Sequence, residues 1–203
     1  MMLRNFVIAA VALSVGLGLG YLVPDAPSFA DAPSEAAVGV EPVAFELIDQ
    51  NGRNVSADSL RGNALLVFFG YTHCPDICPT TLLEMRAVKA ALGDEERRFR
   101  GVFISVDPDR DTPERMREYV DHFDKELLGL TGAAPQVAKA ARSFGAVYER
   151  GKPVTGGGYE MGHTAFGYLV APDGTIETIF PSGTTAPEMA SAVTAVLGRN
   201  RSS

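Results

Sequence analysis

The chain carries the stretch ALLVFFGYTHCPDICP at residues 64–79, and the organisation of the domain can be worked out from it. The stretch opens with an unbroken apolar run that ends at Gly70, which is typical of a buried central strand. Apolar residues at helical spacing predict a helix over residues 80–92. Cys74 and Cys78, the only cysteines of the chain, lie where the strand turns into that helix. Two thiols one helical turn apart can form a disulfide, hold a soft metal ion, or do each in turn.

The rest of the domain alternates strands with helices and ends in an antiparallel hairpin. The patterns predict strands at residues 45–48, 101–106, 166–171 and 175–180, a helix starting at Thr112, and helices over residues 135–144 and 187–197. Residues 147–161 contain three consecutive glycines and are expected to form a flexible hairpin insertion. This order predicts an α/β, thioredoxin-like fold in which helices flank a mixed central sheet.

The N-terminal part of the chain has the features of an export segment. Residues 6–23 carry no charge, and a helix of that length spans roughly 27 Å, close to the thickness of a hydrocarbon core. Residues 1–23 are therefore predicted to be one N-terminal transmembrane helix that serves as a membrane anchor, or else a cleaved signal segment. Arg4 indicates a cytoplasmic N-terminus. Residues 24–43 form a Pro/Ala-rich linker, and residues 44–203 a single folded domain.

The charge of the chain and its export limit the possible functions. A formal net charge of −7 leaves no basic stripe for phosphate, which excludes nucleic acid as a partner. In an oxidising compartment an idle cysteine pair would normally close as a disulfide. A disulfide across so short a loop adds little stability, so a purely structural bond explains the pair poorly.

The chemistry expected of the two thiols depends on the helix that follows them. The positive end of that helix and its free N–H groups should lower the pKa of a thiol and so favour the thiolate. A thiolate is both a nucleophile and a metal ligand, so this effect does not choose between redox and metal chemistry. Disulfide oxidoreductases place two residues between their cysteines, whereas three lie between Cys74 and Cys78 and leave room for an ion.

A histidine stands where thioredoxin-like reductases carry a cis-proline facing their cysteines. No proline lies between Pro153 and Pro172, and His163 occupies the corresponding segment. An imidazole with two thiolates makes a three-coordinate site suited to copper, because sulfur favours Cu(I) and nitrogen makes Cu(II) tolerable. Zinc normally takes four ligands in a closed structural site, and the sequence shows no evident fourth ligand.

Three segments of the chain resemble the Sco/SenC family, namely residues 71–79, residues 107–114 (DPDRDTPE) and residues 162–164 (GHT). The resemblance extends over residues 45–197. Members of this family are membrane-anchored copper proteins of thioredoxin fold that assist the dinuclear copper centre of cytochrome c oxidase. The resemblance therefore implies a copper chaperone.

The resemblance also implies particular ligands and partners. It implies that Cys74, Cys78 and His163 bind a copper ion, Cu(I) or Cu(II), and that residues 44–203 form a copper-binding domain. The implied copper acceptor is subunit II of cytochrome c oxidase, with another copper chaperone or a thiol reductant as further partners. The implied location is the inner membrane, with the soluble domain in the periplasm.

An enzymatic function stays open beside the binding function. A thiol–disulfide reductase would keep the copper-ligand cysteines of the oxidase reduced, using Cys74 and Cys78 as the redox pair without need of His163. A redox or copper sensor is a further alternative.

Several residues near the cysteines and His163 have both a structural and a functional interpretation: His73, expected to point away from the cysteines; Asp76, a helix cap or a copper contact; Asp107, Asp109 and Asp111, turn and cap groups or a docking surface; and Met161, core filler or a copper contact.

Overall fold

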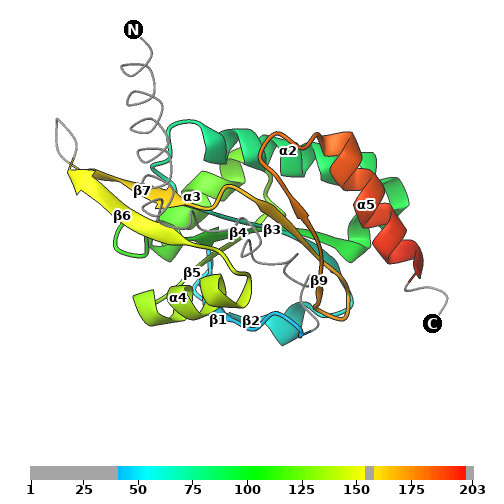
Figure 1. The fold of residues 1–203 in the computed structure, drawn as a ribbon, viewed down its shortest axis with the longest axis horizontal. Coiled ribbons are helices and arrows are strands. Elements are labelled where there is room, and N and C mark those ends of the chain that lie inside the picture. Colours follow the sequence, from blue (N-terminus) through cyan, green and yellow to red (C-terminus); the bar gives the residue numbers. More distant parts are fainter. Residues whose placement is uncertain (1–40, 154–157, 200–203) are drawn as a thin grey trace, which may run out of the picture. The chain divides into compact units, whose positions relative to one another are not determined.

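The computed structural model describes residues 41–153 and 158–199 (Figure 1). The predicted membrane segment and nearly all of the predicted linker lie outside the described residues. Within the described ranges, none of the helices combines the length and the apolar character needed to cross a bilayer. Val43, the last residue of the predicted linker, is buried, and its amide donates a hydrogen bond to the carbonyl of Gly174.

A seven-stranded mixed sheet forms the centre of the domain, in the order β2-β1-β5-β4-β3-β8-β9. Its strands are β1 (Glu46–Asp49), β2 (Asn54–Ser56), β3 (Ala64–Gly70), β4 (Phe99–Ser105), β5 (Leu128–Thr131), β8 (Gly167–Val170) and β9 (Ile176–Phe180). β3, β4 and β5 run parallel, whereas β8 pairs antiparallel with β3 on its other side. All seven residues of β3 are buried, which confirms the predicted central strand.

Helices cover both faces of this sheet, as predicted for a thioredoxin-like α/β fold. The helical elements are η2 (Ala57–Leu60), α2 (Ile77–Ala91), η3 (Gly93–Arg98), α3 (Pro113–Phe123), α4 (Ala134–Ser143) and α5 (Ala186–Arg199). α2 packs against α5 and α3, while α4 packs against β1, and Figure 1 shows α2 and α5 on one face with α4 on the other. α3 begins as predicted, with Thr112 as its cap and Pro113 in its first turn.

Three parts of the fold differ from the sequence prediction, and one of them is the short strand β2, which was not predicted. β5 was not predicted, because its four residues are too few to establish an alternating pattern. α2 begins at Ile77 rather than at residue 80, so Cys78 lies inside its first turn. The chain therefore reaches helical geometry between the two cysteines rather than after them.

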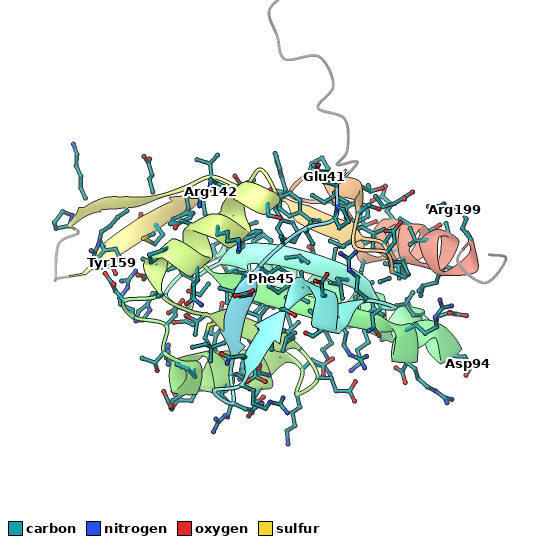
Figure 2. The ribbon with its side chains drawn as sticks, turned by 90° about the horizontal axis from the view of Figure 1, so that it is seen from below. Glu41, Phe45, Asp94, Arg142, Tyr159 and Arg199 are labelled. Carbon is teal, nitrogen blue, oxygen red and sulfur yellow. The ribbon has the colours of Figure 1, made fainter. Side chains whose placement is uncertain are left out.

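The predicted hairpin insertion is an ordered two-stranded sheet over most of its length. β6 (Tyr148–Pro153) pairs antiparallel with β7 (Tyr159–His163), and these two strands form a sheet of their own. Figure 2 shows Tyr159 on this hairpin, at the end of the domain opposite Arg199. β7 extends to His163, two residues beyond the predicted insertion, so the histidine is part of this hairpin.

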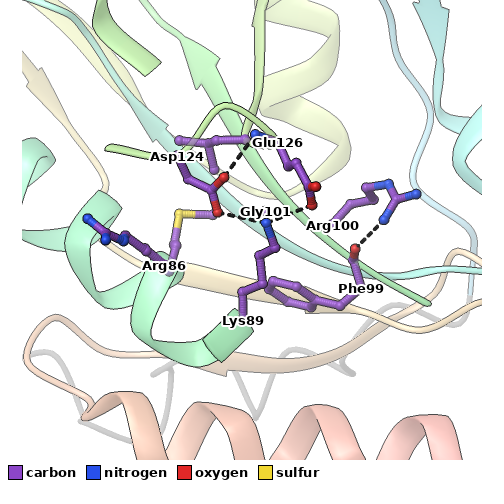
Figure 3. A pocket seen from close by; sticks show the side chains of 9 residues that line it. Arg86, Lys89, Phe99, Arg100, Gly101, Asp124 and Glu126 are labelled. Atoms are coloured by element: carbon purple, nitrogen blue, oxygen red, sulfur yellow. Dashed lines mark hydrogen bonds and ion pairs between the residues drawn. The ribbon is translucent and has the colours of Figure 1, made fainter. Parts of the chain in front are cut away.

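A charged pocket lies at the other end of the parallel strands, where β4 begins (Figure 3). The ammonium of Lys89, in the last turn of α2, lies 2.9 Å from Asp124 Oδ2 and 2.7 Å from Glu126 Oε2. These two acids belong to the connection between α3 and β5. The ion pairs therefore tie the end of α2 to the connection between α3 and β5, far from the cysteines at the beginning of α2.

Gly70 fixes how closely α2 approaches β3. A Cβ atom at this position would lie 2.6 Å from Cys78 Sγ and 2.7 Å from Phe103 Cε2, shorter than any ordinary carbon contact. Because glycine has no Cβ, the thiol of Cys78 can pack directly on the strand.

We expect Gly70→Ala to lower the free energy of unfolding by about 1–3 kcal/mol, because the added methyl group must push Cys78 and Phe103 apart. Urea unfolding followed by circular dichroism measures this change. Gly198→Ala is the matched control: it lies in α5 with nothing within 4 Å of an added Cβ, so its stability should stay unchanged or rise slightly. Equal stabilities of the two variants would contradict the close approach.

Candidate metal centre

The two cysteines occupy the loop from β3 to α2 and the first turn of that helix. Cys78 is fully buried and Cys74 is half-buried, and both are free thiols. The backbone N–H of Cys78 points at Cys74 Sγ, with 3.4 Å between nitrogen and sulfur. The start of α2 thus supplies a donor to the more accessible sulfur, as expected of a helix N-terminus.

His163 reaches the cysteines because of the topology of the sheet. β8 runs antiparallel to β3, with Gly167 opposite Phe68, so the residues just before β8 lie where β3 ends. Nε2 of His163 lies 3.7 Å from Cys78 Sγ, and the ligand atoms of Cys74, Cys78 and His163 all lie within 4.8 Å of one another. The structure therefore brings together the three residues that the sequence singled out.

The orientation of the imidazole leaves one nitrogen free to face the sulfurs. Nδ1 of His163 lies 3.2 Å from the carbonyl oxygen of Thr164, so it carries the proton and donates to that oxygen. The ring edge packs against Phe68 and Tyr71, at centroid distances of 5.9 and 5.8 Å. The lone pair of Nε2 is then directed toward the thiols.

The spacing of the three donors fits a single soft ion. Bonds of roughly 2.3 Å to sulfur and 2.0 Å to nitrogen, spread about 120° apart, would separate sulfur from nitrogen by roughly 3.7 Å and the two sulfurs by roughly 4.0 Å. The observed distance of 3.7 Å and the 4.8 Å limit are close to this triangle. Two sulfurs and one nitrogen are donors that copper accepts in both of its common oxidation states.

Burial determines the protonation of the Cys78 thiol and the His163 imidazole. Burial raises the pKa of the Cys78 thiol well above its usual range, and the neighbouring Cys74 and Asp111 add to the effect. The expectation that the helix would lower the pKa is therefore wrong for Cys78, because loss of solvation outweighs the helix terminus. Burial also lowers the pKa of His163, which keeps its imidazole neutral at neutral pH and able to bind a cation.

Asp111 holds the cysteine loop to the end of β4. Its carboxylate is fully buried and accepts hydrogen bonds from the Thr72 amide at 3.0 Å, the Thr72 hydroxyl at 2.7 Å and the Ser105 hydroxyl at 2.6 Å. Asp107 is also buried and pairs with Arg110, while Asp109 is exposed. The structural interpretation of this acidic loop is therefore confirmed for Asp111 and Asp107.

The other candidates lie beside the centre rather than in it. The exposed ring of His73 points to Thr72 Oγ1, 3.1 Å from its Nδ1, which agrees with its expected orientation away from the cysteines. Asp76 stands at the N-cap position of α2, as the capping interpretation expects, but its exposed side chain makes no capping hydrogen bond among the described residues. Met161 is half-buried and packs against the core.

Two tyrosines close to the centre were missed by the sequence analysis. Burial raises the pKa of Tyr71, which also hydrogen-bonds the backbone of Met161 and so ties β7 to the cysteine loop. Its position directly after Gly70 was the available signal. Burial likewise raises the pKa of Tyr119 on α3, and ionised thiolates at Cys78 and Cys74 would add to this effect. No sequence signal links Tyr119 to the cysteines, since only the packing of α3 on α2 brings them close.

Comparison with known proteins identifies the family. A sequence model described as SCO1/SenC matches residues 34–198. The SCO2-like protein RC0895 of Rickettsia conorii is 36% identical over 180 residues, which cover 83% of this chain and 85% of that protein.

Solved structures agree with this match. The structure of ScoI from Bradyrhizobium japonicum with copper bound is 42% identical, with a TM-score of 0.71 over 77% of this chain and 99% of that one. BsSco, described as a member of the Sco family of cytochrome c oxidase assembly proteins with a disulfide switch, is 28% identical, with a TM-score of 0.62 over 77% and 93% of the two chains. The family match, the relatives and the shared thioredoxin-like fold lead to one conclusion: the chain belongs to the SCO1/SenC family.

Proposed function

We propose that this protein is a copper metallochaperone that binds Cu(I) or Cu(II) through Cys74, Cys78 and His163 and assists maturation of the dinuclear copper centre of cytochrome c oxidase. The observation that carries the proposal is the convergence of two thiols and one imidazole nitrogen within 4.8 Å. The copper-bound state of the similar ScoI and the family description of BsSco support the identity of the metal and the pathway.

The geometry suits a site that must release its metal as well as bind it. Cys78 is fully buried, whereas Cys74 and His163 are half-buried and give an incoming ligand access to one side of the ion. Three ligands leave a coordination position open, so a partner's thiolate can bind before any donor of this chain leaves. Oxidation of the pair to a disulfide would remove both sulfur ligands and expel the ion.

The proposed location follows from the sequence. Residues 6–23, which lie outside the described residues, would anchor the chain in the inner membrane with the copper domain in the periplasm, next to subunit II of the oxidase. Membrane fractionation of expressing cells tests this proposal: recovery of the intact chain in the soluble fraction would contradict it.

A thiol–disulfide reductase is the second candidate, favoured by the unequal exposure of the two thiols. The thiolate of half-buried Cys74 would attack a partner disulfide, forming a mixed disulfide and releasing one partner thiolate. The thiolate of buried Cys78 would then attack Cys74 Sγ, releasing the second partner thiolate and leaving this chain oxidised. His163 has no role in that exchange.

We expect His163→Ala to abolish the sulfur-to-copper absorption band of the Cu(II) form, because two thiolates alone reduce or release Cu(II). Cu(I) should still bind through the two sulfurs, at least about tenfold more weakly. Absorption spectra of the purified full-length protein and chelator competition measure the two effects. His73→Ala is the matched control, since this histidine lies beside Cys74 but faces Thr72, and its spectrum should equal that of the wild type.

The same variants separate the two candidate functions. Oxidase assembly in cells lacking the chromosomal copy should fail with His163→Ala if copper delivery is the function. Full complementation by His163→Ala together with failure of Cys74→Ser and Cys78→Ser would instead favour the reductase. An unchanged Cu(II) spectrum in His163→Ala would remove the histidine from the site.

We expect the affinity for Cu(I) to rise at least about tenfold per pH unit between about pH 6 and pH 8. Burial raises the pKa of Cys78 above this range, so its thiol must release a proton for each ion bound. Protons therefore compete with copper, and binding weakens as the pH falls. Competition titrations against a Cu(I) chelator with known pH dependence measure the slope, and an affinity independent of pH would show that Cys78 is already ionised in the free protein.

A further inference from the structure

The position of His163 depends on a hairpin that is separate from the central sheet. The two cysteines are attached to β3 and α2, which are packed into the core, whereas His163 ends β7 in the two-stranded sheet. Main-chain pairing within the hairpin fixes β7 against β6 but not against the cysteine loop. Side-chain contacts between the hairpin and the body of the domain must therefore set the distance from the imidazole to the sulfurs.

Tyr159, the first residue of β7, contacts Asp107 and Arg110 of the body and also Arg150 within the hairpin. Its hydroxyl donates a hydrogen bond of 2.6 Å to Asp107 Oδ1. The guanidinium carbon atoms of Arg110 and Arg150 each lie 3.7 Å from the centre of its ring. We refer to these contacts of Tyr159 with Asp107, Arg110 and Arg150 as the hairpin latch. Such close approach of arginine to an aromatic ring is attractive because the ring face is negative.

The body side of the latch is firmly held. Asp107 is buried, its amide donates a hydrogen bond of 3.0 Å to the Ser105 hydroxyl oxygen, and its carboxylate pairs with Arg110. The guanidinium of Arg110 has a buried Nη2 without a hydrogen-bond partner among the described residues, and the ring of Tyr159 covers it. Tyr159 therefore contacts the loop that follows β4, and Asp111 of the same loop is hydrogen-bonded to Ser105 at the end of that strand.

The hairpin side of the latch is connected directly to the histidine. Burial alternates along β7, so that Tyr159, Met161 and His163 face the domain while the residues between them face solvent. Tyr159 and His163 thus lie on one face of one strand, about 14 Å apart at 3.4 Å per residue. A displacement of Tyr159 would therefore tilt β7 and move the imidazole of His163 at its other end. Arg150 of β6 adds an exposed ion pair to Asp109 at 3.3 Å.

We propose that Tyr159 is a positioning residue of the metal centre: through Asp107 and Arg110 it holds β7 against the domain and keeps His163 within reach of the two sulfurs. This proposal rests on the proposed function, in which His163 is a copper ligand. The latch then sets how readily the nitrogen ligand leaves. A loosened hairpin lets His163 swing away, while the two thiolates still hold the ion.

Two tyrosine variants separate the parts of the latch. Tyr159→Phe removes only the hydrogen bond to Asp107, whereas Tyr159→Ala also uncovers Arg110 and Arg150. Transfer of Cu(I) from the full-length protein to an excess of chelator should accelerate about threefold in Tyr159→Phe and about tenfold or more in Tyr159→Ala. Lys152→Ala, an exposed position on β6, is the matched control and should transfer copper at the wild-type rate.

A double variant shows whether the latch acts through the histidine. In a His163→Ala background, Tyr159→Ala should give no further acceleration, because the ligand that the latch positions is already gone. An equal acceleration in both backgrounds, or none in either, would overturn the proposal. The Cu(II) absorption band of Tyr159→Ala should shift or weaken while that of Lys152→Ala stays unchanged.

Amide hydrogen exchange tests the latch without copper. In the metal-free chain, Tyr159→Ala should speed exchange at the β7 amides of Met161 and His163, while the amides of β3 stay protected. Faster exchange in a chain that fails to bind copper would retain the latch and reject the proposed function. Unchanged exchange in a chain that binds copper normally would reject the latch alone.

Discussion

The buried carboxylate of Asp111 joins the loop that carries the two cysteines to the end of β4. The carboxylate accepts hydrogen bonds from the amide and hydroxyl of Thr72, two residues before Cys74, and from the hydroxyl of Ser105 at the end of β4. A buried carboxylate must be fully hydrogen-bonded to be tolerated, and these three donors also fix the direction in which the chain leaves β3. The three hydrogen bonds therefore hold the loop that places one cysteine in the first turn of α2 and the other just before it.

The centre combines donors that are carried by separate parts of the fold, the β3–α2 segment and the two-stranded sheet. Cys78 packs on Gly70 with no room for a Cβ atom and is held as rigidly as the core itself. His163 is carried by a two-stranded sheet whose contacts with the domain are made by side chains, among them Tyr71 and Tyr159. Under the proposed function, this division would suit a metal that is bound and then handed on, because His163 could depart while the two thiolates keep the ion.

Two opposed effects of different size act on the ionisation of the Cys78 thiol: the helix N-terminus favours the thiolate and burial disfavours it. A helix N-terminus typically favours a negative charge by about 0.3–1 kcal/mol, whereas full burial can disfavour it by about 4–7 kcal/mol. Cys78 lies in the first turn of α2 and is fully buried, and burial prevails in the free protein. A bound cation would reverse the balance, because it supplies the nearby positive charge that the thiolate lacks. Metal binding and proton release are therefore coupled at Cys78.

Local patterns in the sequence predicted the central strand, the order of most elements and the three residues that converge at the site. An apolar run ending at Gly70, a cysteine pair at a helix start and a histidine in place of a proline are local patterns that can be read directly from the chain. The start of α2, the strand β5 and the thiol pKa were decided only by tertiary structure. Helical geometry at Ile77 depends on packing against β3, β5 is stabilised by pairing with β4 and β1 rather than by its four residues, and the protonation of Cys78 follows from its burial. The role of Tyr159 likewise needed coordinates, because Asp107 and Arg110 lie about fifty residues away in the chain and meet it only when the hairpin folds back.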